Sequence, residues 1–224
     1  IYRCQQLIAL NWEVFPFGND FFQRIMPPKW MLMQLRQRIL NNNKEKENGV
    51  RRAIELFDRH NQLHHNNQSI ILYMRRTGTT RFIDEDNWLI WNIRHLISNL
   101  NNNNNNNNKQ RKNESQSQQG WRLVIHKGNE PIEDQIAMFH LARIVIGPQG
   151  AATANTLFCK PGTHVIEFPG SQHRGDTTNY IAASMGLEYW ITPHVWSSNR
   201  GFYKTDRWKI ESILNTLNHV ISLN

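Results

Sequence analysis

The chain has little cysteine, no long apolar run and no initiating methionine. Its two cysteines, Cys4 and Cys159, cannot form a disulfide framework in 224 residues and lack the spacing of a zinc site, so disulfide-rich and metal-stapled folds are excluded. No stretch approaches the roughly 18 apolar residues of a membrane helix, and the first residues do not have the pattern of a signal peptide. We therefore expect one globular domain, or one domain and part of a second, from a longer protein.

Acidic residues are outnumbered, with 18 against 26 basic residues and a formal net charge of +8. A basic protein can bind nucleic acid, and this is kept as an alternative. The Lys and Arg residues are scattered in ones and twos, however, and no RNA-recognition or zinc-finger pattern accompanies them. The distribution favours a solvated surface, and no nucleic-acid partner is expected.

Two tracts are poor in apolar residues. Residues 41–47 are Asn, Lys and Glu, and residues 99–120 contain a run of asparagines with a polar tail. Because such segments have little to bury, both are expected to be solvated loops, the second being an insertion outside the fold.

The remaining sequence from residue 69 alternates between strand-like and helical patterns. Five short apolar runs have strand composition: Ile70–Met74, Trp121–Ile125, Ile144–Ile146, Thr163–Phe168 and Tyr189–Ile191. Helical spacing follows over residues 84–96, 131–142, 151–158, 180–185 and 207–221, and in the first of these Trp88, Trp91, Ile93 and Leu96 are expected to form the apolar face. This alternation predicts an α/β domain over residues 67–224, a Rossmann-like parallel sheet with helices on both faces.

Residues 1–66 lack a second strand-helix repeat. Leu7–Leu10 could form a strand, and Trp30–Leu40 and Val50–Phe57 are helical in pattern. This segment is interpreted as the remnant of a preceding domain and a linker.

Ligands of parallel α/β sheets bind beyond the carboxyl ends of the strands, so the residues there are the candidates for a site. Arg76 and Arg81 flank a small-residue loop and could pair with a diphosphate, although they could equally be surface arginines. Gly147-Pro148-Gln149-Gly150-Ala151 follows the third strand and could bind an anion at a helix N-terminus, or simply form a tight turn. Glu167 could accept the hydroxyls of a ribose, or form an ion pair.

The order of these features resembles glycosyltransferase family 61. The resemblance runs from about residue 70 to 189. It rests on Arg76 with Arg81-Phe82-Ile83-Asp84-Glu85 and on a set of later segments: Gln135–Phe139, Ile144–Ala151, Asn155, Phe158, Pro161-Gly162, Val165–Phe168, Tyr180, Gly186-Leu187 and Tyr189. The family includes plant xylan xylosyl- and arabinosyltransferases and animal O-linked N-acetylglucosaminyltransferases that act on EGF domains and on O-mannose. Gln149 stands where the family usually has His, and Asp84 where it usually has Asn.

The resemblance implies the C-terminal half of a GT-B fold. It also implies an enzyme that transfers a sugar from a UDP-sugar to a hydroxyl of a glycan or glycoprotein, with inversion and without a metal or other cofactor. The implied donor-binding residues are Arg76, Arg81, Gly147, Gln149, Gly150, Ala151, Asn155 and Glu167, with no assigned catalytic residue. Arg76 and Arg81 would neutralise the diphosphate, and Glu167 would orient the nucleoside.

The family, together with the sequons that begin at Asn67 and Asn113, implies the lumen of the Golgi or endoplasmic reticulum. Membrane attachment is expected only through an anchor outside this chain.

Two alternatives remain at this level. Gln149 cannot carry a proton as His does, and no His and Asp acceptor-side element is visible in residues 1–66, so a non-catalytic nucleotide- or glycan-binding relative is possible. Asp84-Glu85-Asp86 also has the form of a metal-nucleotide motif, although acidic residues are common at the start of a helix.

Overall fold

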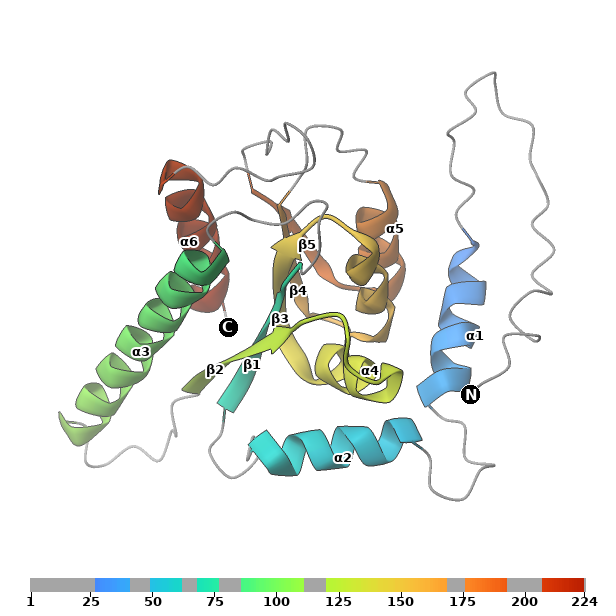
Figure 1. Ribbon diagram of the computed structural model, residues 1–224, viewed down its shortest axis with the longest axis horizontal. Coiled ribbons are helices and arrows are strands. Elements are labelled where there is room, and N and C mark those ends of the chain that lie inside the picture. The colour runs from blue at the N-terminus through green and yellow to red at the C-terminus, as the bar shows by residue number, and fades with distance from the viewer. Residues whose placement is uncertain are drawn as a thin grey trace.

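Five strands and the helices beside them make up the described part of the chain (Figure 1). The computed structural model describes residues 27–40, 49–61, 68–76, 86–110, 120–168, 176–192 and 207–223. In chain order the elements are α1 (Lys29–Leu40), α2 (Gly49–Asn61), β1 (Gln68–Met74), α3 (Asp86–Gln110), β2 (Gly120–His126), α4 (Ile132–Leu141), β3 (Ala142–Pro148), the 3₁₀ helix η2 (Ala151–Phe158), β4 (His164–Phe168), α5 (Asp176–Met185), β5 (Glu188–Ile191) and α6 (Arg207–Ser222).

The sheet is parallel throughout, with the strand order β2-β1-β3-β4-β5. The predicted α/β fold with a parallel sheet is therefore confirmed, and the five predicted runs correspond to the five strands, except that Thr163 lies just before β4. The apolar run in β1 is fully buried from Ile70 to Tyr73, as expected for a strand covered on both faces. Because β3 pairs with β1 and not with β2, the strand order reverses between β1 and β3, which makes this position the topological switch point.

Helices cover both faces of the sheet. On one face, α3 and α6 pack against alternate strand residues that include Ile71, Tyr73 and Ile146. On the other, α1, α4, η2 and α5 contribute buried residues, and α2 adds partly buried ones, around Leu72, Val145 and Val165. No helix in the described ranges is both long and apolar enough to span a membrane.

The helices α1 and α2, which belong to the segment interpreted from the sequence as a remnant and linker, pack against the helices on this face of the sheet, α1 on α5 and η2 and α2 on α4. Leu32 of α1 is buried in the same cluster as the α4 and α5 residues, and Phe57 of α2 packs against it. Arg36 donates a hydrogen bond to the carbonyl of Cys159 at 2.9 Å, and Tyr180 donates one to the carbonyl of Pro27 at 2.7 Å. The apolar faces of both helices thus pack against the sheet domain. Leu7–Leu10 lies outside the described residues.

The prediction that the asparagine tract forms a solvated loop outside the fold is wrong for its first part, since α3 continues through it to Gln110. Adding residues to an existing helix costs far less than nucleating one, so a tract of weak helix formers can extend α3. Asn101 is also tied to the sheet: its side chain accepts from the N–H of Trp121 and donates to the Trp121 carbonyl, both at 3.0 Å.

The predicted apolar face of α3 is also partly wrong. Trp88 and Trp91 are 37% and 58% exposed, while Leu89, Ile90 and Ile93 are buried against the sheet. The helix is rotated from the predicted orientation because this smaller aliphatic set, continued by Ile97, packs against the strands. Trp91 instead stacks on His95, with ring centroids 5.4 Å apart.

Candidate functional site

The topological switch point brings together two of the sequence-predicted elements, the residue after β1 and the turn after β3. Arg76 is the second residue after β1, and Gly147 and Pro148 end the adjacent β3. In doubly wound sheets this crevice binds ligands because the connections from the two strands leave to opposite faces. Here the chain passes from β1 to α3 on one face and from β3 to η2 on the other.

Gly147 lets β3 lie close to β1. A Cβ atom at this position would lie 2.8 Å from Met74 Cβ and 2.9 Å from the Met74 carbonyl oxygen. Both atoms belong to the rigid part of β1, so neither can move away without disturbing the sheet. Glycine is therefore required here for packing, which places the ends of the two strands side by side.

Arg76 and Gly150 are in direct contact. A Cβ atom built on Gly150 would lie 2.5 Å from Nη2 and 2.6 Å from Cζ of Arg76, so the guanidinium occupies the space that a side chain would take. Gly150 immediately precedes η2, whose first N–H groups face this end. A guanidinium and a helix N-terminus thus meet at the carboxyl ends of the strands, an arrangement that suits a phosphate group.

The residues between Gly147 and Gly150 lie at the carboxyl ends of the strands. The Gln149 N–H donates to the carbonyl of Phe168 at 3.1 Å, which joins the turn to the end of β4, and the Gln149 side chain is half-buried. Ala151 is exposed at the start of η2. The sequence predicts a helix over residues 151–158, after the turn that contains Gly147 and Gly150 and is called the glycine turn below. The structure confirms this helix, which has 3₁₀ geometry.

Glu167 is fully buried and is held by protein hydroxyls. Tyr189 donates to one carboxylate oxygen, and the Thr178 hydroxyl lies 3.0 Å from the other. Thr178 is also 3.0 Å from the Thr153 hydroxyl, which donates to the Gly150 carbonyl at 2.7 Å. Where a ribose was expected from the sequence, the structure gives Glu167 these protein partners, and its link to the glycine turn is indirect.

Removing the hydroxyl of Tyr189 should destabilise the fold because Glu167 then loses a donor in a fully buried position. We expect Tyr189→Phe to lower the free energy of unfolding by about 1–3 kcal/mol, measured by urea denaturation. Tyr180→Phe is the matched control, since its hydroxyl donates to the uncharged, partly buried Pro27 carbonyl and its loss should cost about 0.5–1.5 kcal/mol. Equal losses in the two variants would contradict this role for Glu167.

The acidic triplet is represented in the described structure by Asp86 alone. Its carboxylate accepts from the Tyr73 hydroxyl and pairs with Arg75, whose Nε lies 2.6 Å from Oδ2. Burial, followed by the Asp86 charge, raises the pKa of Tyr73 well above its ordinary value, so the phenol stays protonated and donates. Asp86 thus fixes the start of α3 to β1. Arg81, Asp84 and Glu85 lie outside the described residues.

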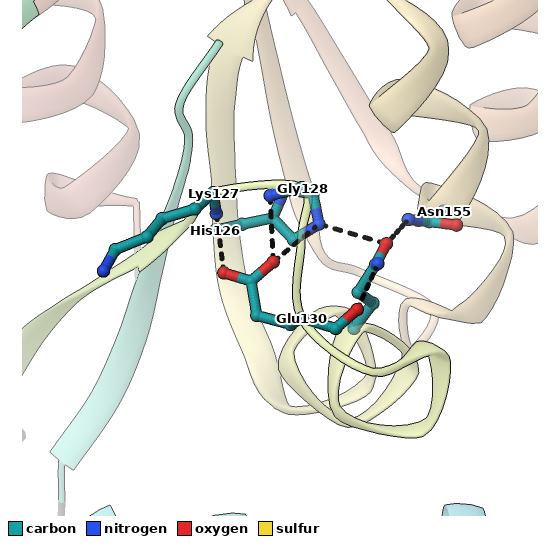
Figure 2. Close-up of polar contacts among 6 residues, drawn as sticks. His126, Lys127, Gly128, Glu130 and Asn155 are labelled. Atoms are coloured by element: carbon teal, nitrogen blue, oxygen red, sulfur yellow. Dashed lines mark hydrogen bonds and ion pairs between the residues drawn. The ribbon is translucent and has the colours of Figure 1, made fainter. Parts of the chain in front are cut away.

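A second polar cluster lies at the end of β2 and was not found from the sequence (Figure 2). Glu130 accepts the backbone N–H groups of Lys127 and Gly128, at 2.7 and 2.9 Å. Although burial raises the pKa of Glu130, the backbone N–H groups and nearby His126 outweigh it, and the pKa lies below its ordinary value. The carboxylate is therefore ionised at neutral pH.

Asn155, the remaining sequence-predicted residue, belongs to this cluster. Its side-chain amide donates to Oε1 of Gln135 at 3.1 Å. The sequence signal for His126 was weak, since it is only a polar residue that ends an apolar strand, whereas Gln135 begins one of the segments on which the family resemblance rests. Among the described residues, no three His, Cys, Asp or Glu side chains gather as a metal site would require.

A doubly wound parallel sheet with a cation and a glycine turn at its switch point is typical of domains that bind nucleotides or nucleotide-linked groups. The chain belongs to glycosyltransferase family 61: the Glycosyltransferase 61 family model matches residues 4–166. A search of the curated proteins found no significant match. Family membership supports glycosyltransferase activity in general, the transfer of a sugar from a donor to a glycan acceptor. The match begins at Cys4, well before the motifs on which the resemblance rests.

Proposed function

We propose that this chain binds a UDP-sugar at the switch point of its sheet and transfers the sugar, with inversion, to a hydroxyl of a glycan or glycoprotein. The observation that carries the proposal is the contact between the Arg76 guanidinium and Gly150, directly before η2. A nucleoside diphosphate leaving group needs positive charge where it departs, and a guanidinium with a helix N-terminus supplies it.

The same contact supports a reaction without a divalent metal. A guanidinium group stays charged at any working pH, and that of Arg76 lies against Gly150. Asp86, the described member of the acidic triplet, is engaged by Arg75 and Tyr73. We therefore assign charge neutralisation to Arg76, with Arg81 as a second candidate, and not to a metal held by this triplet.

We propose supporting roles for Glu167 and Asn155. Glu167 reaches Gly150 through Thr178 and Thr153, and Asn155 holds η2 to α4 through Gln135. We propose that the direct donor contacts come from Arg76 and from the Gly147–Ala151 segment, including Gln149. On the basis of the family and the two sequons, we propose that the reaction takes place in the lumen of the Golgi or endoplasmic reticulum.

Calorimetric titration of the full chain with UDP tests the donor class. We expect UDP to bind with the same affinity in EDTA and in Mg²⁺, and GDP and CDP to bind more weakly. Absence of UDP binding contradicts the proposal, and an affinity that collapses in EDTA contradicts the metal-free part of it. Double-stranded oligonucleotide at two salt concentrations is the control for non-specific binding by a basic protein.

Turnover separates an enzyme from a non-catalytic relative. A panel of UDP-sugars, incubated with glycan acceptors, should release UDP, and the anomeric configuration of the product followed by NMR reports inversion. UDP binding without release of UDP from any donor would support the alternative that Gln149 marks, a nucleotide-binding protein without transfer.

A further inference from the structure

The polar cluster at the end of β2 contains a buried histidine that the proposed donor site does not contact directly. His126 is the last residue of β2 and is 1% exposed. Its ring packs edge-on against Phe139 of α4, with centroids 5.4 Å apart and an interplanar angle of 77°. The ring is therefore held in one position by packing.

The hydrogen bonds around Gln135 determine which nitrogen of His126 carries a proton. The Gln135 amide nitrogen donates to the Glu130 carbonyl at 2.8 Å, so Oε1 is the atom that faces His126. Nε2 of His126 lies 3.2 Å from that oxygen and 3.7 Å from a Glu130 carboxylate oxygen. Because both neighbours of Nε2 are acceptors, Nε2 carries the proton and donates.

Gln135 Oε1 is shared by two donors. His126 Nε2 approaches it from β2, and the Asn155 amide approaches it from η2 at 3.1 Å (Figure 2). An amide can rotate by half a turn and exchange its oxygen and nitrogen. The His126 donor, together with the Glu130 carbonyl, opposes that exchange and keeps an acceptor directed at Asn155.

The two ring nitrogens of His126 differ in their surroundings, because in the described part of the chain only Nε2 has hydrogen-bond acceptors beside it. Nδ1 of His126 is buried and has no hydrogen-bond partner among the described residues. An unsatisfied buried polar atom opposes folding, so an imidazole at this position carries a cost that an apolar side chain would avoid. The polar contacts of the ring are therefore made by Nε2, which faces Gln135 and Glu130.

We propose that His126 is a positioning residue for the donor site: through Gln135 and Asn155 it fixes η2, and so the Gly150 turn against which Arg76 lies. One end of this connection is the Glu130 turn, which the Lys127 and Gly128 N–H groups hold in place. The other end is η2, four residues of which precede Asn155. The consequence for donor affinity rests on the proposed function, whereas the effect on η2 does not.

Two substitutions distinguish the effect of the hydrogen-bond donor of His126 from the effect of its ring packing. The amide nitrogen of His126→Gln can reach the position of Nε2, whereas that of His126→Asn reaches only the position of Nδ1. We expect His126→Asn to weaken UDP binding about tenfold and to speed amide hydrogen exchange in residues 151–158, and His126→Gln to stay close to the unmodified chain in both measurements. The full chain is used, with calorimetry for UDP and mass spectrometry for exchange.

The outcomes are distinguishable. If the unmodified chain does not bind UDP, the proposed function fails, and exchange in η2 still tests the positioning. If His126→Asn leaves exchange in η2 unchanged, or leaves UDP affinity unchanged in a chain that binds UDP, the inference is overturned. Equal losses in the Asn and Gln variants also overturn it, because ring packing on Phe139 would then be the cause.

A second variant keeps the test independent of folding defects at His126. Gln135→Met preserves the length of the side chain and removes the shared acceptor, and we expect it to reproduce the His126→Asn result. Unchanged UDP affinity and unchanged exchange in the Met variant would overturn the proposal. Thermal unfolding of each variant, measured in parallel, confirms that the compared proteins are folded.

Discussion

Gly147→Ala is expected to lower the free energy of unfolding by about 3 kcal/mol, a large loss for one methyl group. The added carbon would lie 2.8 Å from Met74 Cβ and 2.9 Å from the Met74 carbonyl oxygen. These atoms belong to the neighbouring strand, so the sheet itself has to shift. Urea denaturation measures the effect, and Gly120→Ala is the matched control, since its nearest neighbour is the flexible side chain of Gln68 at 3.3 Å.

The obvious compensating substitution should fail. Met74→Ala removes the end of the methionine side chain but keeps both Cβ and the carbonyl oxygen, which are the atoms that clash. The double variant is therefore expected to be no more stable than Gly147→Ala alone. Full rescue by Met74→Ala, or a loss as small as that in the Gly120 control, would contradict the close approach of β1 and β3.

Arg76→Ala is expected to weaken UDP binding by about 1.5–3 kcal/mol, the usual contribution of hydrogen bonds to a charged group, which corresponds to a loss of about 10- to 150-fold. Calorimetry measures the loss. Arg143→Ala is the control. Arg143 carries the same charge but is exposed near the amino end of β3, whereas Arg76 lies at the carboxyl ends of the strands. A similar loss in the control would mean that overall charge, and not a site at Arg76, attracts UDP.

Gly150→Ala tests the same contact from the other side. The methyl group would take the place of the Arg76 guanidinium, which is the flexible end of a long side chain and can move away at little cost to folding. UDP affinity should therefore fall while the urea midpoint changes little. Because both substitutions act through one guanidinium, the double variant should bind UDP no more weakly than Arg76→Ala. Additive losses would show that Gly150 and Arg76 act independently.

The sheet could be predicted from the sequence because its signals are local. Each strand is a short apolar run, and the first is buried on both faces, which produces a continuous pattern such as Ile70–Met74. The order of the strands is not a local property, and so the proximity of β1 and β3 could not be derived. Weak helix propensity gave the wrong answer for the asparagine tract because an existing helix and the Asn101 hydrogen bonds outweigh it.

The candidate site also has a part that could be predicted from local sequence and a part that could not. Arg76 and the glycine turn could be predicted because each lies at the carboxyl end of a strand, where parallel sheets bind ligands. The contacts of the supporting residues could not, since their partners are distant in the chain: Asn155 bonds Gln135, and Tyr189 bonds Glu167. Glu167 was found by its position, but its burial among hydroxyls depends on α5 and β5 packing over it.

The Asn101 hydrogen bonds to Trp121 mark where α3 leaves the sheet. Trp121 lies near the amino end of β2, and the helix continues past it to Gln110. Each asparagine gained or lost beyond Asn101 would change the length of this projecting part by about 1.5 Å and turn its tip by about 100°. These changes occur at the opposite edge of the domain from Arg76 and Gly150. A change in the length of this tract would therefore leave the end of the sheet that carries Arg76 and Gly150 unaltered.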